Sequence, residues 1–203
     1  MSDVVIIDSG GANLASLVFA LRRLGQEAQV SSDAARIRSA SHVLLPGVGS
    51  AGNAMARLNE AGLSEVIPQL TQPVLGICLG MQLLFDFSSE ADAGRASTPC
   101  LGIVPGSVER LVASTALPVP HMGWNRVVAL AADPLFEGMA GTDYFYFVHS
   151  YAAPAGEYSV ALTEYGEHFT AAVRRQNFRG VQFHPERSAQ PGAKLLANFL
   201  RLS

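Results

Sequence analysis

The stretch PVLGICLGMQLLF, residues 73–85, joins an apolar run of strand length to a segment with the pattern of a helix. Cys78 lies at the junction, between Gly76 and Gly80. G-x-C-x-G is the cysteine form of G-x-S-x-G, a motif that places a nucleophile on a sharp strand-to-helix turn. A second interpretation stays open, because free cysteine is among the residue types most often buried in cores.

Strand and helix patterns alternate on the N-terminal side of this junction. Strands are predicted at DVVIID (3–8), EAQVSS (27–32) and HVLLPGVG (42–49), and helices at 13–25 and 50–58. In the first helix, Leu14, Leu17, Val18, Leu21 and Leu24 share one face, and Gly25 is a C-terminal cap. The alternation predicts an α/β fold, with a mostly parallel sheet covered by helices on both faces.

The pattern changes near residue 100. Six short β-rich stretches follow, at 101–111, 120–130, 143–153, 158–165, 168–176 and 179–186, separated by Gly, Pro or Asp. We expect them to form an antiparallel extension, closed by a helix over 191–202. Residues 88–100 are small and polar and are predicted to be a loop. No linker or repeat divides the chain, so one domain over residues 1–203 is expected.

The composition favours some classes of function over others. Hydrophobic residues make up 49% of the 203 residues and charged residues 15%, against roughly 25% in an average domain. Sparse charge favours a deeply buried sheet, a partner interface, or both. The net charge of -3 argues against nucleic acid or an anionic membrane as partner. Two cysteines make no disulfide framework, and no signal peptide or span of ~20 apolar residues is found, so a soluble, unprocessed cytoplasmic protein is expected.

A cysteine nucleophile needs a base, and the base needs an orienting partner. Of the five histidines, His184 stands out, in the stretch GVQFHPE, with Glu186 two residues later. In an extended chain these two side chains face the same side, so Glu186 can bond one ring nitrogen and leave the other for a thiol. The alternative is a histidine at a strand end beside a solvated carboxylate.

Two glycine-rich turns are candidates for anion binding. LLPGVGSAG (44–52) lacks the ending of a phosphate loop, but it suits half of an oxyanion hole facing Cys78, or simply a tight turn. DSGGAN (8–13) lacks a dinucleotide-binding pattern. No histidine or cysteine pair has metal-ligand spacing, so neither a metal nor another cofactor is predicted. The aromatic stretches PHMGWN (120–125) and YFYFVHSY (144–151) are expected in the core or on a sheet surface.

Taken in order, PGVG, GICLGMQLLF, PHMGWN, FVHSY and GVQFHPE resemble the class I (triad) glutamine amidotransferases over nearly the whole chain. PGVG, PHMGWN and FVHSY narrow the resemblance to the glutaminase subunits of imidazole glycerol phosphate synthases. The resemblance implies a flavodoxin-like fold and the hydrolysis of L-glutamine to glutamate and ammonia. Departures from the family pattern are Gly-Gly-Ala-Asn at 10–13, Ser150, and Arg187 after the HPE motif.

The resemblance also assigns roles to residues. Cys78 attacks the glutamine amide, His184 takes the thiol proton and passes it to the leaving ammonia, and Glu186 orients the imidazole. Backbone N–H groups of the Gly47-Val48-Gly49 loop and of Leu79 hold the oxyanion, with Val48 and Gly49 the loop donors. The implied glutamine-binding residues are Gly49, Gln82, Glu90, Ser150 and Tyr151, with Glu90 at the ammonium group. Val48, His121, Asn125 and Tyr146 are implied to lie toward the partner or the ammonia path.

The chemistry itself calls for a partner, because ammonia released into neutral water is protonated and lost as a nucleophile. The chain has no room for an acceptor site, so a second subunit is expected. The resemblance identifies it as the (β/α)-barrel cyclase subunit of the synthase, joined as a heterodimer in histidine biosynthesis. The alternatives are another triad amidotransferase subunit, a free-standing cysteine hydrolase of this fold, and a catalytically silent binding module.

Overall fold

A computed structural model describes residues 3–8, 14–91, 96–115, 117–129, 131–141 and 143–203. Within these ranges, eight strands form one sheet in the order β2-β1-β3-β4-β14-β13-β12-β9. Its first five strands are parallel: β2 (Ala28–Ser31), β1 (Val4–Ile7), β3 (His42–Gly47), β4 (Val74–Cys78) and β14 (Phe178–Val181). The remaining three are antiparallel: β13 (Glu167–Arg175), β12 (Ser159–Tyr165) and β9 (Val128–Ala129).

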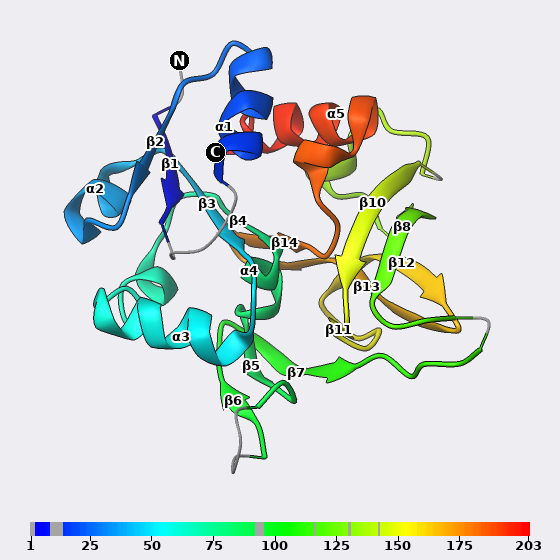
Figure 1. Cartoon of the computed structure of the whole chain (residues 1–203). Helices are drawn as coiled ribbons and strands as arrows, with labels where there is room; N and C mark the ends of the chain where they lie inside the picture. The colour runs from blue at the N-terminus through cyan, green and yellow to red at the C-terminus, as the bar shows by residue number, and fades with distance from the viewer. Residues whose placement is uncertain (1–2, 9–13, 92–95, 116, 130, 142) are drawn as a thin grey trace.

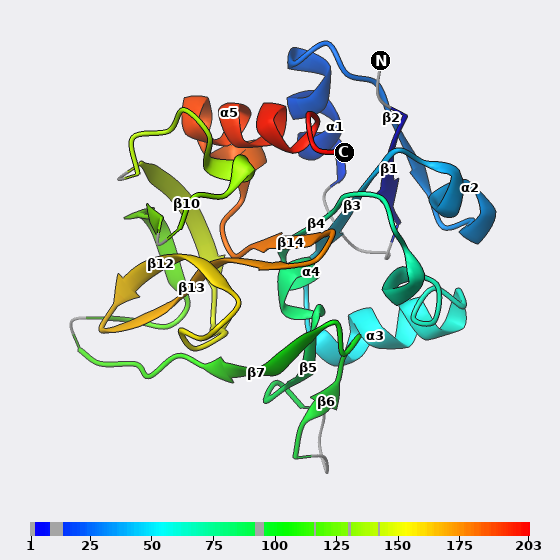
Figure 2. The ribbon, with the colours of Figure 1, turned by 180° about the vertical axis from the view of Figure 1, so that it is seen from behind.

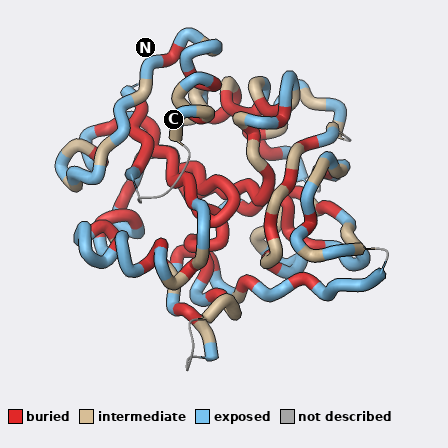
Figure 3. The backbone as a smooth tube through the Cα atoms, viewed as in Figure 1, coloured by how far each residue is buried: buried red, intermediate tan, exposed pale blue. Residues whose placement is uncertain are grey.

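Helices cover both faces of the parallel part (Figures 1 and 2). Because side chains alternate along a strand, Val4 and Ile6 enter one core and Val5 and Ile7 the other. The first core contains α1 (Leu14–Arg23) and α5 (Ala189–Phe199), and the second contains α2 (Ala34–Ser39), α3 (Ala51–Glu60) and the 3₁₀ turn η1 (Ile67–Gln69). Strands β1, β3 and β4 are buried along their whole length, whereas the edge strand β2 is partly exposed (Figure 3). The predicted flavodoxin-like α/β fold is confirmed.

Two smaller sheets flank the large one. In the first, β10 (Tyr144–His149) pairs antiparallel with β8 (His121–Arg126). In the second, the order is β11-β7-β5-β6, from β11 (Tyr151–Ala152), β7 (Val104–Arg110), β5 (Phe85–Ser88) and β6 (Thr98–Pro99). Two 3₁₀ turns, η2 (Pro134–Phe136) and η3 (Pro185–Arg187), complete the described elements. The predicted extension is therefore divided among three sheets, and in the two smaller ones it is antiparallel except that β7 pairs in parallel with β5.

The predicted helix after Cys78 is wrong in extent. Only α4 (Leu79–Gln82), a single turn, is helical, and β5 begins at Phe85. The carbonyl of Leu83 accepts from the Leu101 N–H, and the carbonyl of Leu84 from Ile103 and Val104. These backbone bonds to a distant segment replace the bonds that a longer helix would need.

Two further predictions need correction. β14 was expected in the antiparallel extension, but it pairs in parallel with β4, inside the central sheet. The predicted loop over 88–100 contains strand β6 at its end, paired with β5. The predicted turn at 8–13 lies outside the described residues from position 9 onward.

Candidate active site

Cys78 is the last residue of β4 and lies on a strained turn. Its backbone has φ 54° and ψ −114°, a region that costs a residue with a side chain about 1–3 kcal/mol. The neighbouring strand places Gly47 directly opposite Cys78. The turn lifts the thiol above the end of the sheet, where parallel α/β folds place their ligand sites. The strained turn that the G-x-C-x-G pattern predicts is thus present.

The two glycines of the motif allow backbones to approach closely. A Cβ on Gly80 would lie 1.7 Å from the carbonyl oxygen of Leu45, and one on Gly76 would lie 2.7 Å from the oxygen of Gly80. Real Cβ atoms do not come this near to backbone, so the turn excludes any side chain at either position. Close packing of α4 against β3 and β4 therefore fixes the position of Cys78.

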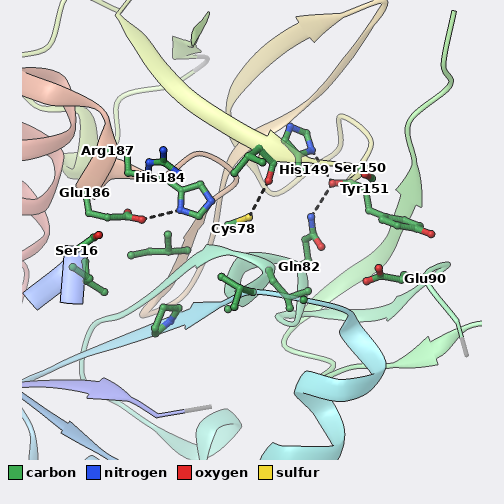
Figure 4. Close-up of a pocket in the computed structure, with 18 residues that line it drawn as sticks. Ser16, Cys78, Gln82, Glu90, His149, Ser150, Tyr151, His184, Glu186 and Arg187 are labelled. Carbon is green, nitrogen blue, oxygen red and sulfur yellow. Dashed lines mark hydrogen bonds and ion pairs between the residues drawn. The ribbon is translucent and has the colours of Figure 1, made fainter. Parts of the chain in front are cut away.

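His184 approaches Cys78 from the end of the neighbouring strand. β14 ends at Val181, and the His184 N–H donates to the Tyr146 carbonyl at 2.9 Å, which ties this segment to β10. His184 Nδ1 and Glu186 Oε1 are 2.8 Å apart (Figure 4). The predicted contact is present, although its predicted origin is wrong. Glu186 lies in η3 rather than in an extended strand, and the 3₁₀ turn brings its carboxylate back to the ring.

The surroundings of His184 favour its charged form. Burial of the ring opposes protonation, but Cys78 and Glu186 outweigh it and raise the pKa of His184 to about 10. The second ring nitrogen, Nε2, is buried and has no hydrogen-bond partner in the described residues. The Cys78 thiol is directed instead at the carbonyl oxygen of Val148, 3.8 Å away. A buried Nε2 beside a thiol can take the thiol proton once the Sγ–H turns toward it.

One cavity of about 630 Å³ contains the whole predicted site (Figure 4). Its lining includes every residue that the sequence predicts for catalysis, substrate binding or the oxyanion: Val48, Gly49, Cys78, Leu79, Gln82, Glu90, Ser150, Tyr151, His184 and Glu186. The residues come from the ends of β3 and β4, from α4, and from the segments after β5, β10 and β14. Their roles stay predictions, but their arrangement around one cavity is what those roles require.

Two of the lining residues are held by bonds to the protein. A carboxylate oxygen of Glu90 accepts the Ala51 N–H at 2.8 Å, at the first turn of α3, where a negative charge is favourable. Gln82 is 4% exposed, and its amide nitrogen donates both to Tyr151 O at 2.8 Å and to Gln182 Oε1 at 2.9 Å. Glu90 and Gln82 are therefore positioned before any ligand binds.

Gln182 is a site residue that the sequence interpretation missed. Its side chain is fully buried, and its Nε2 lies 3.7 Å from the Cys78 sulfur, within reach of a hydrogen bond to sulfur. It lies two residues before His184, in the same GVQFHPE stretch, and alternation along that stretch would have placed both toward Cys78. That spacing was the available signal.

The residues expected toward a partner divide into two groups. His121 and Asn125 line a second cavity of about 830 Å³ beside Met122 and Trp124. Tyr146 lies under the guanidinium of Arg187, which is 4.5 Å from the ring centre and lines the first cavity. Val48 is 40% exposed at the edge of the first cavity.

A pair of buried histidines connects the two cavities. His121 Nδ1 lies 3.0 Å from His149 Nε2, and His149 Nδ1 lies 2.9 Å from the carbonyl oxygen of Tyr151. Burial lowers the pKa of His121 to about 4 and that of His149 to about 3. Both rings are therefore neutral at pH 7, and neither can replace His184 as a charged partner of Cys78.

A metal-binding group and a membrane-spanning helix are both absent from the described residues. In the described ranges, His, Cys, Asp and Glu side chains form no group of three or more that could hold a metal ion. No helix in the described part of the chain has the length and apolarity needed to cross a membrane.

A model of the family described as "Glutamine amidotransferase class-I" matches residues 5–202. The chain belongs to the class I glutamine amidotransferases. Curated members of this family are similar over their whole length. "Imidazole glycerol phosphate synthase subunit HisH" of Shewanella oneidensis is 50% identical and covers 98% of this chain and 96% of its own. A subunit of the same description in Haemophilus influenzae is 50% identical, with 98% of each chain covered.

Solved structures of distant amidotransferases have the same fold. A putative GMP synthase protein from Thermoplasma acidophilum superposes with a TM-score of 0.73 at 18% identity, covering 98% of this chain and 92% of its own. PurLQS from Thermotoga maritima gives 0.69 at 17% identity, with 98% of each chain covered. These likenesses concern the fold alone.

The relatives confirm the predicted function of this amidotransferase. It is a glutamine-hydrolysing enzyme, the glutaminase subunit of imidazole glycerol phosphate synthase in histidine biosynthesis. Because it is one subunit of a synthase, it has a partner subunit.

Proposed function

We propose that Cys78, His184 and Glu186 hydrolyse glutamine through a thioester and that the ammonia passes directly to a (β/α)-barrel cyclase subunit. The observation that carries this proposal is the 2.8 Å bond between His184 and Glu186 beside a cysteine with positive φ, in one cavity. All of residues 1–203 serve as one amidotransferase domain in this proposal, and the cytoplasm is its compartment.

The reaction begins with proton transfer from the Cys78 thiol to Nε2 of His184. Glu186 accepts a hydrogen bond from the other ring nitrogen, Nδ1, and stabilises the imidazolium. The thiolate attacks the side-chain amide carbon of glutamine, and the C–N bond breaks as His184 protonates the departing nitrogen. Ammonia leaves, and a glutamyl thioester remains on Cys78. Water, deprotonated by His184, then attacks the thioester, and glutamate and the thiol are released.

Backbone N–H groups hold the negative oxygen of the two tetrahedral intermediates. Leu79 follows the nucleophile, as the first donor does in other strand-to-helix nucleophile turns. The loop Gly47-Val48-Gly49 lies across from it, since Gly47 pairs with Cys78 in the sheet and Gly49 has φ 89°. A donor aimed at such an oxygen contributes about 10²–10³-fold in rate.

The substrate lies between Glu90 and Cys78. The Glu90 carboxylate pairs with the ammonium of glutamine, while Gly49, Ser150 and Tyr151 line the cavity between the two ends. Gln82 uses its amide nitrogen on the protein, so its oxygen serves as acceptor for a substrate N–H.

An apolar surface beside the site supports a protein partner. On β8 and β10, Met122 is 63% exposed, Trp124 53% and Tyr144 55%. Large apolar side chains exposed together mark interaction surfaces. This surface, which we call the β8–β10 face, and Val48 at the cavity edge are where the barrel subunit docks in our proposal.

The proposal is tested with the reconstituted two-subunit synthase. Cys78→Ala should abolish synthesis from glutamine and leave synthesis from added ammonium salt unchanged, because only the supply of ammonia is lost. If the Cys78→Ala complex still uses glutamine, the nucleophile assignment is wrong. If the isolated chain hydrolyses glutamine as fast as the complex, the dependence on a partner is wrong.

A further inference from the structure

Gln182 connects the nucleophile to the substrate-binding residues through side-chain amides. It is fully buried, accepts a hydrogen bond from Gln82 Nε2 at 2.9 Å and places its own Nε2 3.7 Å from the Cys78 sulfur. Gln82 in turn donates to the carbonyl oxygen of Tyr151. The three side chains therefore form one chain of hydrogen bonds under the floor of the cavity.

The Tyr151 carbonyl determines which amide atoms of Gln82 and Gln182 donate and which accept. The Tyr151 carbonyl can only accept, so the amide atom of Gln82 that lies 2.8 Å from it is the nitrogen. That nitrogen has a second hydrogen, which it gives to Gln182, so the Gln182 atom at 2.9 Å is the oxygen. The Gln182 NH₂ group is left to face Cys78. The reverse orientation would place two acceptors together at Tyr151.

His149 and His121 also fix the position of the Tyr151 carbonyl oxygen, at the end of the hydrogen-bond series away from Cys78. His149 Nδ1 donates to Tyr151 O, so His149 Nε2 accepts from His121 Nδ1, and His121 Nε2 accepts from Asn125. Each ring is neutral with one proton, which agrees with the lowered pKa of both. The Tyr151 carbonyl oxygen is thereby held in place. The orientations of the Gln82 and Gln182 side-chain amides are fixed by it in turn.

We propose that Gln182 is a further catalytic residue, whose side-chain N–H donates to the Cys78 sulfur and stabilises it as a thiolate. The inference rests on the proposed function of Cys78. In the thiol form, Sγ–H donates to Val148 O. Once the proton has moved to Nε2 of His184, the sulfur can only accept, and Gln182 is a second side-chain donor, already in place before the transfer. A hydrogen bond to an ionised acceptor is about twice as strong as a hydrogen bond to a neutral acceptor.

The donation acts at both chemical steps. It favours the thiolate that attacks the amide, and it favours the departure of the same thiolate when water cleaves the thioester. A thioester sulfur is a weak acceptor, so the bond is weakest in the intermediate and strongest on either side of it. An interaction of this kind lowers the barrier for release of the sulfur.

The test is the rate of alkylation of Cys78 by iodoacetamide as a function of pH, in the isolated chain without glutamine. The titratable and charged groups lining the cavity around the sulfur are Glu90, His149, Tyr151, His184, Glu186 and Arg187, and all of them stay unchanged in the variants. Cys78 and Cys100 fall in different tryptic peptides, separated at Arg95. Cys100, whose pKa burial raises to about 11, is the internal reference.

Gln182→Met keeps the shape and removes the donor. We expect the midpoint of the Cys78 profile to rise by about one pH unit, which is about tenfold less reaction at a fixed lower pH. Gln182→Glu places a negative charge beside the sulfur and should raise the midpoint further. The matched control is Asn198→Leu, which removes an equally buried amide in α5 and should leave the profile unchanged.

A folded Gln182 variant with the wild-type profile overturns the proposal. Where neither variant folds, the wild-type protein decides, because the side-chain amide resonance of Gln182 should titrate with the Cys78 midpoint, and a resonance that does not move overturns the proposal. These results are separate from the tests of the proposed function, whose nucleophile assignment fails if Cys78→Ala retains glutamine-dependent synthesis.

Discussion

Gly80 approaches Leu45 so closely that a Cβ on the glycine would lie 1.7 Å from the carbonyl oxygen of the leucine. This contact presses the first turn of α4 onto β3 and holds Cys78 in its strained conformation. The nucleophile turn is therefore maintained by the packing of α4 against β3 and not by its own sequence alone.

Gly80→Ala should destabilise the protein by about 3 kcal/mol or more, because neither backbone can move away without breaking the central sheet. Chemical denaturation measures the change. Gly156→Ala is the control, since a Cβ there meets no atom closer than 4.0 Å. Equal stability of the two alanine variants would contradict this account of the turn.

Glu186→Gln should lower the rate of glutamine hydrolysis by the synthase about 10²–10⁴-fold. The amide cannot stabilise the imidazolium of His184, whose pKa is raised to about 10 in part by the carboxylate. Glutamate release under saturating glutamine is the measurement. Glu137→Gln, at an exposed residue after η2, should retain full activity, and a Glu186→Gln enzyme as active as this control would remove Glu186 from the triad.

The buried pair His121 and His149 should make its own contribution to stability fall on mild acidification. His121 and His149 bind protons in the unfolded chain near pH 6.5 but in the folded chain only near pH 4 and 3. Their contribution is complete above pH 6.5 and is lost as the pH falls, through about 4 for His121 and about 3 for His149. His121→Phe keeps the ring stacking on Tyr165 and should lose less unfolding free energy between pH 7 and 4.5 than the wild type.

The control for this pH effect is His168→Asn, at a side chain that is 64% exposed. Its loss of stability over the same range should equal that of the wild type. An identical pH dependence in His121→Phe and the wild type would show that the buried pair is not kept neutral.

Trp124→Ser should weaken binding of the barrel subunit at least about 30-fold, as loss of an aromatic anchor does at an interface. Titration calorimetry measures the affinity. Val30→Ser is the control, because Val30 is 39% exposed on β2, at the edge of the sheet opposite to β9. Tight binding by Trp124→Ser would exclude the β8–β10 face from the interface.

The sequence was sufficient where the determinants are local. Cys78 between two glycines, and His184 two residues before Glu186, are patterns within a few residues, and the structure brings all three to one cavity. The alternation of apolar runs likewise predicted the parallel sheet and its helix layers, since each strand and helix carries its own periodicity.

The remaining features depend on contacts between distant segments. The helix after Cys78 stops because backbone N–H groups of residues 101–104 donate to the carbonyl oxygens of Leu83 and Leu84. No local sequence pattern reveals these bonds. Gln82 and Gln182 meet across one hundred residues only because β14 lies beside β4. The spacing to His184 directs Gln182 toward Cys78, but its bond to Gln82 depends on the strand order of the folded sheet.

The central claim is that Cys78 is the nucleophile toward glutamine. Peptide mass spectrometry after incubation with the glutamine analogue diazo-oxo-norleucine tests it most directly. We predict a single covalent adduct on the peptide that carries Cys78, formed more slowly in the presence of excess glutamine and absent in Cys78→Ala. An enzyme that is inactivated with the adduct on any other residue, or Cys78→Ala protein that is still labelled and inactivated, would contradict the account.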